Sequence, residues 1–183
     1  MPPSPRISPA EPPYPPEIEA RLAALMPAGV PPLLLFRTLA RDRRLFARFM
    51  GGGLLDCGHL TLRQREIVID RVTARCGAEY EWGVHVAFFA RRVGLDDAQL
   101  RSLVRGGPED ACWAAEERLL LRLCDAVIDA CDVDDALWAE LRGRFGEEAM
   151  LELLLLAGFY RTVSCLVRVL RLPPEPYAAR FPA

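Results

Sequence analysis

Residues 61–95 decide the fold, and they read TLRQREIVIDRVTARCGAEYEWGVHVAFFARRVGL. Thr61 and Gln64 have the spacing of a capping box, in which each side chain binds a backbone N–H left free at the start of a helix. A helix is therefore expected over 62–76, ended by Gly77, because helices often close on a glycine in the left-handed conformation. A second helix is expected over 79–93, ended by Gly94 in the same way. The stretch predicts a tight helical hairpin.

The segments on either side of the hairpin also carry helical periodicity. Strand-like alternation bounded by hairpin turns is not found in the sequence, and no internal repeat stands out. Apolar residues instead recur at intervals of three and four, as on one face of a helix. Further helices are expected over 16–26, 31–50, 96–104, 112–131, 134–145 and 147–170. The predicted fold class is all-α, a helical bundle built around the central hairpin.

Length and proline content predict the domain organisation. A chain of 183 residues, 51% of them hydrophobic, suits a single domain with one core. Eight of the first sixteen residues are proline, which lacks a backbone donor and favours extended conformations. We therefore expect a disordered proline-rich arm over 1–16, a single helical domain over 17–175 and a C-terminal tail over 176–183.

Charge and composition exclude several classes of function. The net charge of −2 and the pI near 5.8 provide no basic field for a nucleic-acid backbone, so nucleic acid is not expected as a partner. All 23 cationic side chains are arginines. Enzymes that depend on a Schiff-base lysine, a pyridoxal-phosphate lysine or a P-loop lysine are therefore excluded.

The cysteines and the apolar segments point to a cytoplasmic protein. Six cysteines occur without a CxxC pair, and the sequence shows no signal-peptide pattern, so they are interpreted as reduced thiols. The pair Cys57 and His59 has no matching second half and does not indicate a metal site. The most apolar run, 153–160, is shorter than the roughly 18–20 residues of a membrane span and is interpreted as a core helix, so no membrane is expected.

Three side chains of the hairpin form the candidate catalytic site. Glu81 and His85 are four residues apart, so their side chains can meet on one helix face. Glu66 lies on the stripe of the preceding helix that should face the core, where a carboxylate is costly to bury without a partner. The turn at Gly77 makes a shared pocket for Glu66, Glu81 and His85 geometrically reasonable. The alternative from spacing alone is a solvated acidic cap beside a histidine packed in the core.

The same stretch resembles a known family. Arg65-Glu66, then Glu79-Tyr80-Glu81-Trp82, then His85, followed by Ala90 and Gly94-Leu95, is similar to the signature hairpin of the carboxymuconolactone decarboxylase superfamily, which includes alkylhydroperoxidase D. The resemblance covers roughly residues 60–105, and the flanking helices match in kind and order. In the alkylhydroperoxidase D branch it implies two cysteines at positions that here hold Ala78 and Glu81. The thiolate chemistry of that branch is therefore not expected.

The resemblance to the decarboxylase branch implies a role for each candidate residue. His85 would donate or accept the proton, because its unperturbed pKa lies near neutrality. Glu66 would orient His85, and Glu81 would be a second acid or base. Tyr80 and Trp82 would shape the substrate pocket, and Arg161 would bind an anionic group. The implied substrate is a small molecule, a carboxylated lactone or related organic acid, and no cofactor or metal is expected.

The sequence is also compatible with three other functions. The first alternative is a peroxidase-like oxidoreductase that uses Cys76 with another thiol. The second is a non-catalytic oligomeric binding protein. A third is a divalent metal site formed by Glu66, Glu81 and His85. The resemblance also implies a homo-oligomer, a trimer or a hexamer.

Overall fold

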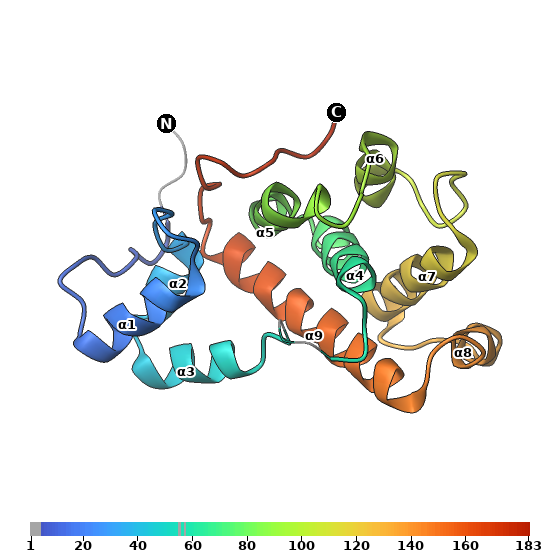
Figure 1. Ribbon diagram of the computed structural model, residues 1–183, viewed down its shortest axis with the longest axis horizontal. Helices are drawn as coiled ribbons and strands as arrows, with labels where there is room; N and C mark the ends of the chain where they lie inside the picture. The colour runs from blue at the N-terminus through green and yellow to red at the C-terminus, as the bar shows by residue number, and fades with distance from the viewer. Residues whose placement is uncertain (1–4, 55, 57) are drawn as a thin grey trace.

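The computed structural model describes residues 5–54, 56 and 58–183, and in these residues all regular structure is helical (Figure 1). The elements are α1 (Pro16–Leu25), α2 (Leu34–Leu39), α3 (Arg43–Gly51), α4 (Leu62–Arg75), α5 (Glu79–His85), the π-helical turn η1 (Val86–Ala90), α6 (Asp97–Arg105), α7 (Ala115–Ala130), α8 (Asp135–Arg142) and α9 (Glu147–Val169). The predicted all-α class is confirmed.

The central hairpin forms as predicted. Thr61 and Gln64 make the reciprocal capping box at the start of α4. Gly77, with φ +65°, turns the chain from α4 into α5, and Gly94, with φ +68°, ends the second arm. Such φ values are strained for residues that carry a Cβ. One feature differs from the prediction, because the second arm changes from α-helix to π-helix over η1, directly after His85. Single π turns inside helices occur frequently at functional sites.

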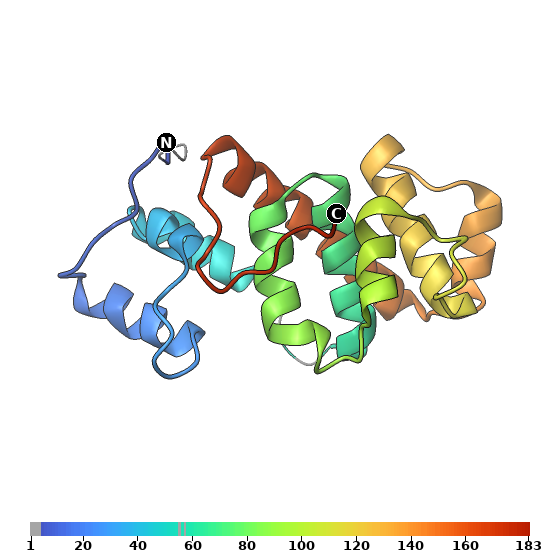
Figure 2. The same ribbon diagram turned by 90° about the horizontal axis from the view of Figure 1, so that it is seen from above.

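The core is built around α4. Its residues 66–73 are all buried, because α7 and α9 pack against it together with α5 and α6 (Figures 1 and 2). The long helix α9 turns a single stripe inward. That stripe consists of Met150, Leu153, Leu156, Ala157, Tyr160, Val163, Ser164 and Val167. Spacings of three and four keep these residues on one helix face, the arrangement of an amphipathic helix.

The apolar run 153–160 is too short to span a membrane, but the whole of helix α9 is not. The helix has 23 residues, and by length and composition alone it could cross a membrane. This is weak evidence, because core helices of soluble proteins pass the same test. Part of the apolarity lies on the outer face, where Leu151, Leu155 and Val169 are exposed.

The N-terminal part differs from the prediction in one way. The helix expected over 31–50 is two helices, α2 and α3, because Asp42 caps α3 by accepting a hydrogen bond from the Leu45 N–H. The described part of the proline-rich arm makes backbone hydrogen bonds to the helical part of the chain. The N–H of Arg6 donates to the Leu170 carbonyl, and that of Ala10 donates to the Arg37 carbonyl. Helices α1 and α3 share a small second core, formed by Ile18, Leu22 and Phe46.

The C-terminal tail crosses the outer side of α5 as an extended strap. The N–H of Ala179 donates to the Gly83 carbonyl at 3.0 Å. A Cβ at position 83 would lie 2.2 Å from the Ala179 carbonyl oxygen, so only glycine permits this approach. The Phe181 N–H donates to Glu79, two residues before Glu81. The strap thereby fixes the helix that carries Glu81 and His85.

Candidate active site

Glu66, Glu81 and His85 meet in the interior of the molecule. Helix α4 supplies Glu66, whose Oε2 accepts a hydrogen bond of 2.8 Å from Nδ1 of His85 on α5. Glu81 lies one turn before His85, and its Oε1 is 3.5 Å from Nε2 of the ring. All three side chains are buried. The imidazole therefore lies between two carboxylates, one at each nitrogen.

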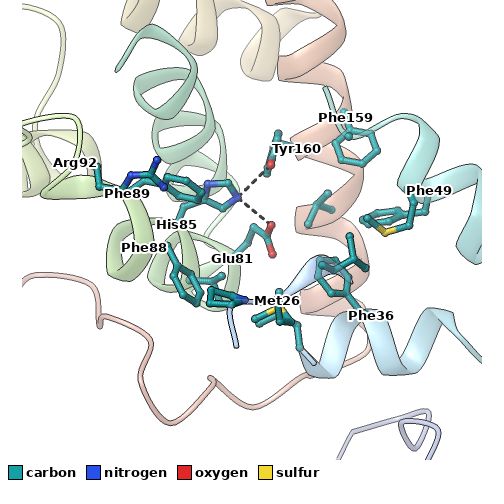
Figure 3. A pocket seen from close by; sticks show the side chains of 17 residues that line it. Met26, Phe36, Phe49, Glu81, His85, Phe88, Phe89, Arg92, Phe159 and Tyr160 are labelled. Atoms are coloured by element: carbon teal, nitrogen blue, oxygen red, sulfur yellow. Dashed lines mark hydrogen bonds and ion pairs between the residues drawn. The ribbon is translucent and has the colours of Figure 1, made fainter. Parts of the chain in front are cut away.

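Tyr160 is a fourth member of this group that the sequence analysis did not select. Its hydroxyl lies 3.1 Å from Nε2 of His85, and its ring contacts the imidazole edge-on (Figure 3). Helix α9 places it there through the inward stripe described above. The periodicity of that stripe is the sequence signal that identifies Tyr160.

The surroundings of His85 favour its charged form. Burial disfavours the imidazolium and is the largest single influence. The hydrogen bonds and charges of Glu66 and Glu81 together outweigh burial and raise the pKa of His85 to about 10. At neutral pH the ring therefore carries both protons, with Nδ1–H directed at Glu66 and Nε2–H available to Glu81, to Tyr160 or to a bound molecule.

Two further ionisable side chains surround the group. Asp70 lies one turn after Glu66 on α4 and is buried. Burial, together with the charges of Glu66 and Glu81, raises its pKa well above the ordinary range, so it holds its proton. Arg65 approaches Glu66 Oε1 at 3.6 Å. We call Glu66, Asp70, Glu81, His85 and Tyr160 the charged end of the site.

An apolar cavity of about 250 Å³ opens from the charged end, with Glu81, His85 and Tyr160 in its lining (Figure 3). Most of the remaining lining is apolar, and we call these residues the apolar wall. It consists of Leu25, Met26, Leu33, Phe36, Phe49, Met50, Phe88, Phe89 and Phe159. Arg92 also lines the cavity, where it is exposed and lies over the Phe89 ring. The described residues thus form a mostly apolar chamber with polar groups concentrated at one end.

The three predicted substrate-pocket residues do not line this cavity. Tyr80 points the other way, and its hydroxyl donates to Glu175 in the C-terminal segment. Trp82 packs against Phe181 of the strap. Arg161 is exposed on a different face of α9 from Tyr160 and donates to the sulfur of Cys131. The predicted place of Arg161 in the substrate pocket is therefore wrong, because a step of one residue along a helix rotates a side chain by about 100°.

The thiols lie apart from the charged end. Ala78, at one of the family's cysteine positions, is the N-cap residue of α5. Cys76 is half-buried, and burial raises its pKa, which disfavours the thiolate. It lines a separate surface pocket with Arg161 and Cys165. Cys131 is exposed at the end of α7. Cys57 lies outside the described residues.

The geometry does not favour the alternative of a metal site. Within the described ranges, no three candidate ligand side chains converge on one point. Glu66 and Glu81 approach different nitrogens of the His85 ring, which lie on opposite sides of it. The two carboxylates and the imidazole therefore cannot direct their donor atoms at a single ion.

Comparisons with known proteins agree with this fold. Residues 43–123 match the carboxymuconolactone decarboxylase family. An uncharacterized peroxidase-related protein from Silicibacter sp. TM1040 has a similar structure, with a TM-score of 0.80, 18% identity, and coverage of 97% of this chain and 98% of the other. A peroxidase-related protein with an alkylhydroperoxidase AhpD core from Ralstonia eutropha JMP134 gives a TM-score of 0.78, 20% identity, and coverage of 89% and 87%.

A third similar structure has a described activity. The debrominase Bmp8 gives a TM-score of 0.76 at 14% identity and covers 94% of this chain and 93% of its own. A Bmp8 variant has also been solved in complex with 2,3,4-tribromopyrrole. The comparison with curated proteins finds no match. At these identities the structural matches establish the fold alone. Residues 43–123 thus match the carboxymuconolactone decarboxylase family model, and the chain has an AhpD-like fold.

Proposed function

We propose that the protein is a cofactor-free enzyme that transfers a proton to or from a small organic molecule, with His85 as the proton carrier. The observation that supports this proposal is the buried imidazole held between Glu66 and Glu81 at the end of a mostly apolar chamber. Exclusion of water strengthens the interactions of such groups with a reacting molecule. A positioned histidine of this kind typically contributes 10²–10⁴-fold to the rate of a proton-transfer step.

Each group has a role in the proposed chemistry. In a decarboxylation, the bond between carbon and the carboxyl group breaks, carbon dioxide leaves, and the electron pair stays on that carbon. The Nε2–H of His85 then gives its proton to the carbon, while Glu66 holds the opposite side of the ring. Without loss of carbon dioxide, Glu81 takes a proton from one carbon and His85 returns one to another. The match of residues 43–123 to the carboxymuconolactone decarboxylase family favours a lactone or related organic acid as substrate.

A substrate carboxylate would lie at the Arg92 side of the chamber. Arg92 supplies the guanidinium of the cavity lining, so we assign to Arg92 the anion-binding role that was expected of Arg161. The charged end is unsuited to an anion, because Glu66 and Glu81 would repel it.

Hydrogen–deuterium exchange tests this proposal. A panel of carboxylated γ-lactones is incubated with the protein in D₂O, and NMR follows deuterium uptake at carbon and release of carbon dioxide. We expect exchange with the wild type and little with His85→Gln. Absence of exchange across the panel would favour the non-catalytic binding protein, and equal exchange by His85→Gln would show that His85 is not the proton carrier.

The peroxidase-like alternative has less support. The chamber is lined without a cysteine among the described residues, and Cys76 opens into a different pocket. Consumption of an organic hydroperoxide with a thiol reductant, lost in Cys76→Ser, would reinstate it.

We also propose that the chain assembles with copies of itself. The outer face of α9 exposes Leu151, Leu155 and Val169, each more than half accessible. An apolar helix face left open to water is typical of an association surface. Light scattering at micromolar concentration should give a mass above that of one chain, and Leu155→Glu should lower it. A wild-type monomer would contradict the proposal.

A further inference from the structure

Three oxygens of the charged end have no hydrogen-bond partner among the described residues, namely Glu66 Oε1, Asp70 Oδ1 and Glu81 Oε2, and of these three residues Glu81 alone lines the chamber. Glu81 Oε2 is buried and accepts no hydrogen bond from any group in the described residues, whereas Oε1 faces His85. Glu81 is 6% exposed and lines the chamber. A carboxylate oxygen removed from water without a donor is costly, so the position is suited to a donor from a bound molecule.

The chamber around this oxygen suits an aromatic ring. Phenylalanine rings contributed by α2, α3, η1 and α9 form much of the wall (Figure 3). Packed aromatic groups favour edge-on and offset contacts with another ring. A cavity of roughly 150 Å³ with comparable lining binds benzene. The volume here, about 250 Å³, leaves room for a ring with substituents.

We infer that the chamber binds a compact, uncharged aromatic molecule that donates an O–H or N–H hydrogen bond to Glu81 Oε2. This inference goes beyond the proposed function, because it names a neutral ligand of the same chamber and not the carboxylated substrate of the reaction. The ring fills the apolar wall, and the donor group lies beside the Nε2–H of His85. An anionic group cannot take the donor's place, because it would meet the Glu81 carboxylate at close range with no proton between them.

Three ligands of matched size test the inference by binding alone. They are p-cresol, which carries a neutral O–H at pH 7, p-xylene, which has no donor, and p-toluate, which is an anion at that pH. NMR titrations give each dissociation constant. A hydrogen bond to a buried charged group corresponds to roughly 10- to 100-fold in affinity, so p-cresol should bind tighter than p-xylene by about that factor. The affinity for p-cresol should also exceed the affinity for p-toluate.

The substitution Glu81→Gln makes the test specific to this oxygen. Glutamine has nearly the same shape, removes the negative charge and adds N–H donors. The variant should therefore lose most of its preference for p-cresol over p-xylene and gain affinity for p-toluate. Glu148→Gln is the matched control, because Glu148 is exposed at the start of α9 and does not line the chamber. It should leave all three affinities unchanged.

Several outcomes would overturn the inference. Equal binding of p-cresol and p-xylene by the wild type is one, and an unchanged order of affinities in a folded Glu81→Gln protein is another. Circular dichroism and thermal melting establish that the variants are folded. A third is displacement of p-cresol by p-toluate at equal concentration. Failure of deuterium exchange with normal p-cresol binding would instead remove the catalytic proposal and leave the ligand class in place.

Discussion

The charged end and the apolar wall come from different parts of the chain. All of the charged end except Tyr160 lies on the α4–α5 hairpin, within the region 43–123 that matches the family. Leu25, Met26, Leu33 and Phe36 of the wall precede that region. Under the proposed function, the groups that transfer the proton and much of the surface that contacts the ligand therefore come from different parts of the chain.

The largest effect should follow from replacing the proton carrier. His85→Gln removes the ionisable ring and should lower the rate of deuterium exchange by roughly 10²–10⁴-fold. The affinity for p-cresol should change little, because its hydrogen bond goes to Glu81. Exchange rates and NMR titrations measure the two quantities. A loss of binding as large as the loss of rate would break the separation between charged end and apolar wall.

Glu66→Gln should act through His85. Glutamine keeps an acceptor oxygen for Nδ1–H but removes the charge, so the pKa of His85 should fall. Loss of this charge-assisted hydrogen bond should also reduce the free energy of unfolding by about 1–3 kcal/mol. Histidine NMR titration measures the pKa, with His59, which is exposed, as the internal control. Identical titration of His85 in both proteins would show that the two groups do not interact.

The hairpin and three groups of its site could be predicted from the sequence because they depend on local rules. Capping, glycine at helix ends and the four-residue spacing of Glu81 and His85 act within one or two helical turns. Asp42 is the N-cap residue of α3 and is a similar local signal. The prediction of a single helix over 31–50 did not take it into account. Tyr160 was missed for a related reason, since Arg161 was chosen one position away from the inward stripe of α9.

The apolar wall could not be predicted in this way. Phe36 and Phe89 line one cavity although 53 positions separate them, and no local pattern specifies that contact. The switch to π-helix at Val86–Ala90 is also invisible to helical periodicity, because a single wider turn hardly changes which residues are apolar. Tyr80 and Trp82 were assigned to the pocket because they flank Glu81, but neighbours along a helix point in different directions.

Stability should fall as pH rises through the range in which His85 titrates. Its folded pKa of about 10 lies above the unfolded value of about 6.5, so the folded protein binds the extra proton. The contribution is complete below about pH 6.5 and is lost as pH rises through the folded pKa. Asp70, whose pKa is also raised, acts in the same direction from lower pH.

Urea unfolding between pH 6 and pH 10 measures this dependence. His85→Gln should remove the part of the decline above pH 6.5 and keep the part due to Asp70. A wild-type stability that is level or rises over this interval would show that His85 is neutral in the folded protein.

The smallest effect should follow from truncating a side chain of the apolar wall that does not belong to the charged end. Phe36→Ala removes one ring of the wall. Complete burial of a phenylalanine side chain contributes a free energy of about 1.5–3 kcal/mol. Phe36 lies partly exposed in the unliganded protein, so p-cresol affinity should fall by about tenfold, near the lower part of that range. The exchange rate at saturating ligand should stay close to the wild-type value, because no group of the charged end has changed. Leu45→Ala is the control, since Leu45 is exposed on α3 and does not line the chamber. If Phe36→Ala lowered the saturated rate and left affinity intact, the N-terminal helices would have to act on the charged end itself, and the division of roles between the two regions would be wrong.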